Sequence, residues 1–164
     1  VLCRAFVTAH PDSIDSHGVL GKLSAEAGDG EGAQSAFQEV IDRFPERPDG
    51  YLSLANLYAQ AGRPDVALRV IDDGLVKNPT QPVLLLQRGT FFSEMGDPAR
   101  AIGDFQRLLE VDPTSIDGFH NLAIAYARLE EYDKALAVLA RGLKAHPDSP
   151  MLLVNRGGVY HAME

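Results

Sequence analysis

The sequence contains little of what enzymes and nucleic-acid-binding proteins use. It has a single cysteine, Cys3, so an internal disulfide or a CxxC site is impossible, and Cys3 itself falls at a core-facing position of an expected helix. Lys and Arg number 15 against 23 Asp and Glu, the net charge is −8, and no basic run occurs. Because nucleic-acid affinity comes largely from clustered Lys and Arg, the composition argues against a nucleic-acid partner.

Long apolar runs are also missing. No stretch approaches the roughly 20 apolar residues of a membrane span, because Gln87 and Arg88 interrupt the most apolar segment. The N-terminal segment has no basic region and no small-residue cleavage site, so it does not resemble a signal peptide. With 45% hydrophobic and 23% charged residues, we expect a soluble protein without membrane insertion, and the compartment, cytoplasmic or periplasmic, stays open.

Groupings of catalytic or metal-ligating residues do not occur in the sequence. The five histidines form no His–Cys, Ser–His–Asp or His–x–x–x–His arrangement. Glu130, Glu131 and Asp133 cluster, but solvated charge at a turn explains them. The glycines at 28–32 follow no predicted strand, which favours a flexible turn over a phosphate loop. The sequence therefore predicts no enzyme, no metal site and no cofactor.

Internal repetition dominates what is present. Prolines recur every 34 residues, and a period of this size is typical of stacked supersecondary units. These prolines are Pro11, Pro45, Pro79, Pro113 and Pro147. The period defines repeats one to four as 14–47, 48–81, 82–115 and 116–149. Residues 1–13 then form the end of a preceding repeat, and 150–164 form the first helix of a fifth.

Small and large residues recur within each repeat in the pattern of two amphipathic helices. Small residues occupy the eighth position (Gly21, Ala55, Gly89, Ala123) and the twentieth (Ala33, Ala67, Ala101, Ala135). Larger residues occupy the eleventh (Tyr58, Phe92, Tyr126) and the twenty-fourth (Phe37, Ile71, Phe105, Leu139). The small side chains let two helices approach closely. Gly28, Gly62 and Gly96 predict the ends of first helices, and Pro64 and Pro98 suit the first turn of second helices.

This pattern resembles the tetratricopeptide repeat (TPR) family over essentially the whole chain. Repeat four matches the family motif at Phe119, Leu122, Ala123, Tyr126, Ala135, Leu139 and Pro147. Repeat two matches it at Tyr51, Leu54, Ala55, Tyr58, Ala67, Gly74 and Pro79. The resemblance implies an all-α superhelical solenoid of αα-hairpins, a single array over residues 1–164. Departures are His17 and Ser24, which predict looser packing of repeat one, Arg88 in place of Leu, and Glu130 in place of Gly.

In this family the first helices line a concave surface that binds ligands. By this resemblance the groove comprises Lys22, Leu52, Asn56, Leu86, Gln87, Thr90, His120, Asn121, Ile124, Arg128 and Asn155. A row of amides can hydrogen-bond a peptide backbone, while aliphatic residues supply shallow pockets. We therefore expect a protein–protein interaction module that binds an extended peptide or a helical segment of a partner. That these residues form only a solvated inner face stays open.

A second hypothesis concerns the ends of the array. The last helix is expected to present Leu152, Leu153, Val159 and Tyr160 without a following helix to cover them. Solenoids usually hide such faces under polar capping repeats. The alternative function is therefore a structural scaffold block that self-associates or stacks through its uncapped ends.

Overall fold

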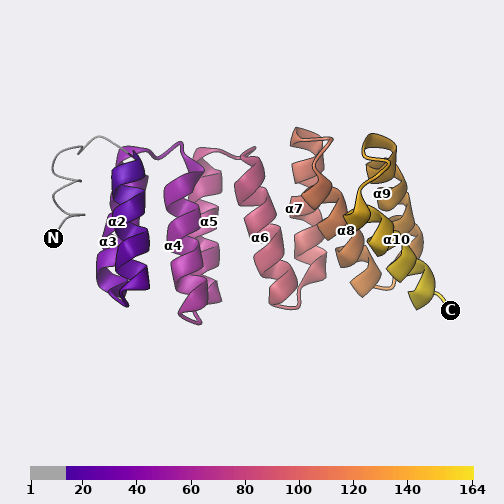
Figure 1. Ribbon diagram of the computed structural model, residues 1–164, viewed down its shortest axis with the longest axis horizontal. Coiled ribbons are helices and arrows are strands. Elements are labelled where there is room, and N and C mark those ends of the chain that lie inside the picture. The colour runs from indigo at the N-terminus through magenta and orange to yellow at the C-terminus, as the bar shows by residue number, and fades with distance from the viewer. Residues whose placement is uncertain (1–13) are drawn as a thin grey trace. The chain divides into compact units, whose positions relative to one another are not determined.

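The computed structural model describes residues 14–164, and the secondary structure in this range is helical. Nine helices with short connections make up this part of the chain (Figure 1). They are α2 (Ile14–Glu26), α3 (Gly30–Arg43), α4 (Pro48–Gln60), α5 (Pro64–Lys77), α6 (Pro82–Glu94), α7 (Pro98–Val111), α8 (Ile116–Arg128), α9 (Tyr132–Ala145) and α10 (Pro150–Ala162). The even-numbered helices, which are the first helices of the repeats, begin 34 residues apart. Cys3, Pro11 and the partial repeat expected at 1–13 lie outside the described residues.

The chain divides into two compact units, Val1–Leu84 and Leu85–Glu164, with the boundary inside α6. In the N-terminal unit, α2 and α3 form one helical hairpin and α4 and α5 form another, and α3 packs against α4 (Figure 1). In the C-terminal unit, α8 contacts α7, α9 and α10, and α10 also contacts α9. First helices of successive repeats touch in both units, α2 with α4 and α8 with α10. The predicted fold class, an all-α helical repeat solenoid, is confirmed.

Pairs of small and large residues hold the two helices of a repeat together, as predicted. Ala33, Ala67, Ala101 and Ala135 are completely buried. At Gly89 a Cβ atom would lie only 2.5 Å from Cε1 of Phe105, so glycine is what lets α6 approach the Phe105 ring. Phe105 is itself fully buried, and burial of a side chain of this size stabilises by about 1.5–3 kcal/mol.

The turns between the two helices of a repeat have the glycine and proline residues at the places predicted from the sequence. Gly28, Gly62 and Gly96 have φ values of 75°, 71° and 79°, a left-handed conformation that glycine adopts without steric cost. Glu130 takes the same place in repeat four with a φ of 60°. This conformation costs an L-residue about 1–2 kcal/mol. Glu130 therefore preserves the turn of repeat four at a cost in conformational free energy. Pro64 and Pro98 stand in the first turns of α5 and α7, as predicted.

Two other departures have a structural explanation. His17 takes the place that Tyr51 has in repeat two, and it is buried. Arg88 forms a two-pronged ion pair with Asp104, in which Nε lies 2.9 Å from Oδ2 and Nη2 lies 2.6 Å from Oδ1. The Asp104 side chain is only 6% exposed. The charge at Arg88 therefore has its partner on the second helix of the same repeat. Looser packing of repeat one stays a prediction.

The expectation for α10 is partly wrong. Leu152 and Val159 are buried, with exposures of 0% and 5%, because they face the preceding repeat. Leu152 lies against Gly142 of α9, where a Cβ would come within 2.9 Å of it. Leu153 and Tyr160, at 40% and 54% exposed, do face outward as expected. Helix α10 therefore buries only the side on which Leu152 and Val159 lie.

Candidate ligand groove on the first helices

In the N-terminal unit, the groove residues predicted on α2 and α4 line shallow depressions between these helices. Lys22 and Asn56 line one of about 290 Å³, together with Glu26 and Gln60. Leu52 and Lys22 line a second of about 250 Å³. The structure thus brings Lys22, Leu52 and Asn56 to one surface, and this surface mixes charges and amides with a few apolar atoms.

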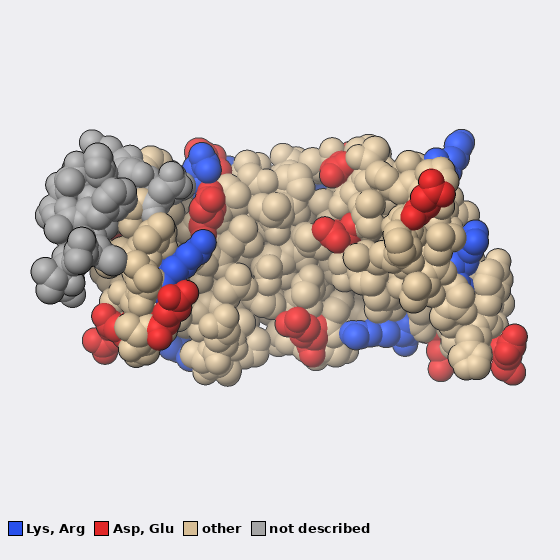
Figure 2. All heavy atoms as spheres, in the orientation of Figure 1, with Lys and Arg blue, Asp and Glu red and all other residues tan. Residues whose placement is uncertain are grey.

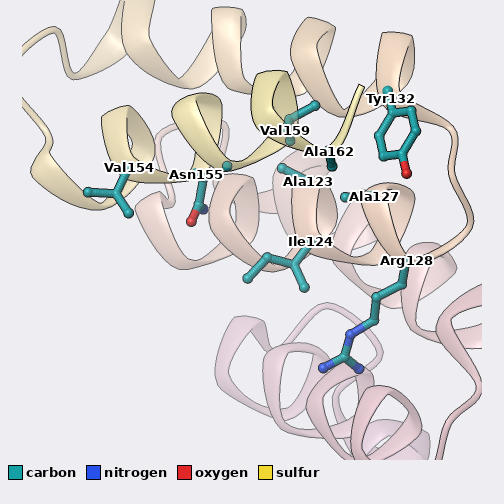
Figure 3. A pocket seen from close by; sticks show the side chains of 10 residues that line it. Ala123, Ile124, Ala127, Arg128, Tyr132, Val154, Asn155, Val159 and Ala162 are labelled. Atoms are coloured by element: carbon teal, nitrogen blue, oxygen red, sulfur yellow. The ribbon is translucent and has the colours of Figure 1, made fainter. Parts of the chain in front are cut away.

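In the C-terminal unit, a larger and more apolar pocket lies between α8 and α10. Its volume is about 410 Å³, and Figure 3 shows α8 and α10 contributing side chains on its two sides. We call it the α8–α10 pocket, and it is lined by Ala123, Ile124, Ala127, Arg128, Tyr132, Val154, Asn155, Gly158, Val159 and Ala162. The pocket exists because first helices of adjacent repeats present small residues here. Of the predicted groove residues, Ile124, Arg128 and Asn155 line it.

The polar residues beside the α8–α10 pocket are held in place by neighbours. The side-chain amide nitrogen of Asn155 donates to Nδ1 of His120 at 2.7 Å, which links α10 to α8. The amide nitrogen of Asn121 instead donates to the backbone carbonyl of Asp117 in its own helix, at 2.9 Å. Within the described residues, no hydrogen bond to the side-chain oxygens of Asn121 and Asn155 is found. Both oxygens are therefore placed to accept from a ligand.

Arg128 lines the α8–α10 pocket with its stem but points its charge elsewhere. Figure 3 shows its side chain extending from α8 away from α10. Its Nη1 donates to the backbone carbonyl of Ser93 at 2.8 Å. The guanidinium thus has a structural role, since it satisfies a carbonyl near the end of α6.

The predicted groove residues on α6 are less available than expected. Leu86 is partly buried and packs against the core of the C-terminal unit. The Thr90 hydroxyl donates to the carbonyl of Leu86 at 2.9 Å, which turns it back onto its own helix. Gln87 is half-buried and already takes part in an interaction. These three residues shape the surface of α6 more than they offer free polar groups.

Sequence reasoning did not assign Tyr132 to the groove. It is the first residue of α9, a second helix, yet its ring lines the α8–α10 pocket (Figure 3). Sequence reasoning also recognised Arg88 as a departure without finding Asp104. The available signal was that both residues replace apolar ones, Leu122 and Val138 in repeat four, within a single repeat.

Charged side chains are scattered on the face of the molecule that Figure 2 draws. On the face drawn in Figure 2, the Lys and Arg side chains lie apart from one another and do not form one patch. Among residues 14–164 there is no group of three His, Cys, Asp or Glu side chains that could hold a metal ion. In the same range no helix is both long enough and apolar enough to cross a bilayer.

Shifted pKa values have structural causes. Burial raises the pKa of Tyr51, and nearby carboxylates add to the effect. A hydrogen bond from the backbone N–H of Arg100, with a second from its side chain, lowers the pKa of Asp97. The carboxylate of Glu131 raises the pKa of Lys134 by accepting a hydrogen bond from it. Cap and ion-pair contacts of this kind stabilise helices, and they do not assemble an acid–base pair.

Comparisons with solved structures identify the same architecture in other proteins. The chain is 21% identical to MamA, with a TM-score of 0.73, and the match covers 92% of this chain and 82% of that one. It is 23% identical to TTC0263, a thermophilic TPR protein of Thermus thermophilus, with a TM-score of 0.73 and coverage of 98% and 88%. It is 20% identical to YrrB, described as a TPR protein with an unusual peptide-binding site, with a TM-score of 0.69 and coverage of 92% and 78%.

A comparison with curated proteins finds no match. At these identities, the solved structures show likeness of fold alone. The family model for the tetratricopeptide repeat, however, matches residues 24–87 and 93–153, which is well over half of the chain. The chain therefore belongs to the tetratricopeptide repeat family, whose helical solenoids generally act in protein–protein interaction and are typically not enzymes.

Proposed function

We propose that the chain binds an extended peptide or a helical segment of a partner protein along its first helices. The observation that carries the proposal is the apolar α8–α10 pocket of about 410 Å³. Pockets that bind ligands are mostly apolar and have a few placed polar groups. The amide oxygens of Asn121 and Asn155 supply such groups beside the apolar surface of Ile124 and Val154.

Val154 is the residue on which a test is best built. It lines the α8–α10 pocket and is 73% exposed, so a charge placed there does not disturb the core. Val76 on α5 is 77% exposed and lies outside that pocket, which makes it a matched control. Val154→Glu and Val76→Glu introduce the same charge at equally exposed helical valines.

The experiment selects peptides from a displayed random library on the full chain and measures their affinities by fluorescence anisotropy. We expect Val154→Glu to weaken the selected peptides by about tenfold or more, because burying a carboxylate against an apolar ligand costs over about 1.4 kcal/mol. Val76→Glu should leave the affinities unchanged. Selected peptides that ignore Val154→Glu, or that lose affinity equally with both variants, would overturn the proposal.

The spacing of essential residues in the selected peptides tells the two binding modes apart. A helical ligand anchors through residues at i, i+3, i+4 and i+7, whereas an extended ligand anchors through alternate residues and its backbone. Methylation of the peptide's backbone nitrogens should abolish binding of an extended ligand whose N–H groups donate to the side-chain oxygens of Asn121 and Asn155. An alanine scan of one selected peptide therefore assigns the mode.

A further inference from the structure

The contact between His120 and Asn155 decides which end of an amide group faces the α8–α10 pocket. Figure 3 shows the Asn155 side chain extending from α10 toward α8, and its Nδ2 lies 2.7 Å from Nδ1 of His120. An amide NH2 group only donates, so Nδ1 of His120 must accept and carries no proton. The ring is then neutral, with its proton on Nε2. The other end of the amide, Oδ1 of Asn155, has no partner among residues 14–164 and is left for a ligand.

The preceding repeat carries an amide at the same position that is held in a different way. Asn121 is the sixth residue of repeat four, as Asn155 is of the fifth repeat, and its Nδ2 donates to the backbone carbonyl of Asp117 at 2.9 Å. A backbone carbonyl accepts at every pH. The residue of repeat three that corresponds to His120 is Leu86, whose side chain has no polar atom. The orientation of Asn121 is therefore independent of pH, whereas that of Asn155 depends on a ring that can gain a proton.

In the described part of the chain, no charged group forms an ion pair with His120. Asp117 lies three residues earlier on the same helix and is exposed, and Arg156 is exposed next to Asn155 on α10. The other charged side chains of the neighbouring helices are exposed, or are paired as Arg88 is with Asp104. They are Arg88 and Glu94 on α6, Arg100, Asp104, Arg107 and Glu110 on α7, Asp133, Lys134, Arg141 and Lys144 on α9, and His161 on α10. The proton of His120 itself is therefore the charge that changes at this contact.

Protonation of His120 is incompatible with the observed orientation of Asn155. An imidazolium ring donates from both nitrogens, so Nδ1 can no longer accept from the NH2 group of Asn155. The two side chains keep a hydrogen bond only if the amide rotates by half a turn and Oδ1 accepts from Nδ1–H. The NH2 group then takes the place of Oδ1 beside the α8–α10 pocket. Protonation therefore replaces a hydrogen-bond acceptor in the groove by a donor.

We propose that His120 is a positioning residue that makes the groove select an extended peptide at neutral pH and release it in mild acid. This inference rests on the proposed function. Neutral His120 holds Oδ1 of Asn155 ready to accept a backbone N–H group of the ligand, and protonated His120 turns that acceptor away. An extended peptide has such N–H groups to donate, whereas the N–H groups inside a helix are bonded to its own carbonyls. Histidine is the side chain that ordinarily changes its charge between about pH 5 and pH 8.

The full chain without ligand tests the orientation of the amide. In isotope-labelled protein, a hydrogen bond from Nδ2 of Asn155 to Nδ1 of His120 produces a scalar coupling between the two nitrogens in NMR spectra. Long-range imidazole spectra show which ring nitrogen carries the proton. We expect the coupling and an Nε2–H ring at about pH 8, and loss of the coupling at about pH 5. A ring protonated on Nδ1 at about pH 8, without the coupling, would overturn the proposal.

Peptide affinity tests the consequence for binding. The probe is an extended peptide without His, Asp or Glu, selected from the displayed library at neutral pH, whose affinity falls with Val154→Glu. Its affinity, measured by fluorescence anisotropy, should fall by about fivefold to tenfold from about pH 8 to pH 5, the effect of one lost hydrogen bond. His120→Gln offers Asn155 an acceptor that does not titrate, so its affinity should be the same at both pH values. His120→Lys donates to Asn155 throughout this range and should bind the peptide weakly at both.

His146 provides a matched control. Its Nε2 lies 2.7 Å from the backbone carbonyl of Thr114 and must donate, which both the neutral and the protonated ring can do. His146→Gln should therefore leave the pH profile of peptide affinity unchanged. A profile that His120→Gln does not flatten, or selected peptides that are all helical, would overturn this inference and leave the proposed function standing. If no selected peptide responds to Val154→Glu, the proposed function fails and this inference fails with it, so the two failures are told apart.

Discussion

Repeats three and four use different chemistry at the same two positions. In repeat four, Leu122 and Val138 are both buried in an apolar core. In repeat three the same positions hold Arg88 and Asp104, whose side chains are 26% and 6% exposed and form an ion pair. The helices α6–α7 and α8–α9 are otherwise alike in length and phase. The comparison teaches that this fold tolerates a charge in the helix–helix contact as long as the opposing charge is placed across from it.

The ion pair makes the stability of repeat three more sensitive to a single substitution than that of repeat four. Replacing a buried ion pair by well-packed apolar residues is often neutral or stabilising, whereas removing one partner is costly. A charged pair also restricts which second helix can pack on which first helix. We therefore expect the ion pair of repeat three to restrict the pairing of its two helices more than the apolar contact of Leu122 and Val138 does in repeat four.

The largest expected effect comes from breaking the ion pair. Asp104→Val leaves Arg88 mostly buried without its counter-ion and should lower the free energy of unfolding by about 3 kcal/mol. The double variant Arg88→Leu/Asp104→Val, which copies repeat four, should return to within about 1 kcal/mol of the starting protein. Urea unfolding followed by circular dichroism measures both. A double variant as unstable as Asp104→Val would contradict the comparison.

The next effect concerns the glycines of α6 and α10. Gly89→Ala forces a Cβ to within 2.5 Å of the Phe105 ring and should destabilise by about 1–3 kcal/mol through overpacking. Gly157→Ala meets nothing within 4 Å and should stabilise by about 0.5–1 kcal/mol, because alanine favours the helix. Thermal unfolding gives opposite signs for the two.

A rescue variant sharpens this result. Gly89→Ala combined with Phe105→Leu copies the Ala123 and Leu139 pair of repeat four and should recover most of the stability lost. If Gly89→Ala proved as stabilising as Gly157→Ala, the close approach of α6 and α7 would not govern the choice of glycine.

The fold follows from the sequence because its determinants are local and repeated. Small residues such as Ala67 and Ala101 mark where two helices touch, and Gly62 with Pro64 marks the turn between them. Each copy supplies the same information again, so chance matches are suppressed. The expectation for α10 is wrong at Leu152 and Val159 because these side chains, at the third and tenth positions of the repeat, pack on the preceding repeat and need no following helix to cover them.

The candidate site is less predictable than the fold. The phase of a helix tells which residues share a face, and Ile124 and Asn155, which were expected on the inner face, line one pocket. Helix phase does not reveal that the Thr90 hydroxyl donates to a carbonyl of its own helix, or that Arg128 donates to the carbonyl of Ser93. These hydrogen bonds depend on which acceptor lies within reach of each polar group. The pairing of Arg88 with Asp104 was open for the same reason, since the residues lie 16 positions apart.

The smallest expected effect compares the starts of α7 and α9. Asp97 caps α7 by accepting from the backbone N–H of Arg100 at 3.1 Å, and its other oxygen accepts from Nε of the same residue. Glu131 at the start of α9 makes no side-chain cap, only an exposed ion pair with Lys134. Asp97→Ala should therefore lower Tm by a few degrees at pH 7, and Glu131→Ala should change it little.

Acid should erase the effect of Asp97→Ala. The pKa of Asp97 is lowered in the folded state, chiefly by the Arg100 backbone hydrogen bond. Its stabilisation is thus fully present above the ordinary carboxylate pKa of about 4 and is lost as pH falls through the lower, folded-state value. Melting curves from pH 7 to pH 2 should show the Tm difference shrinking below about pH 4. A Tm difference that stays constant to pH 2 would mean that Asp97 stabilises α7 through packing and not through its charge.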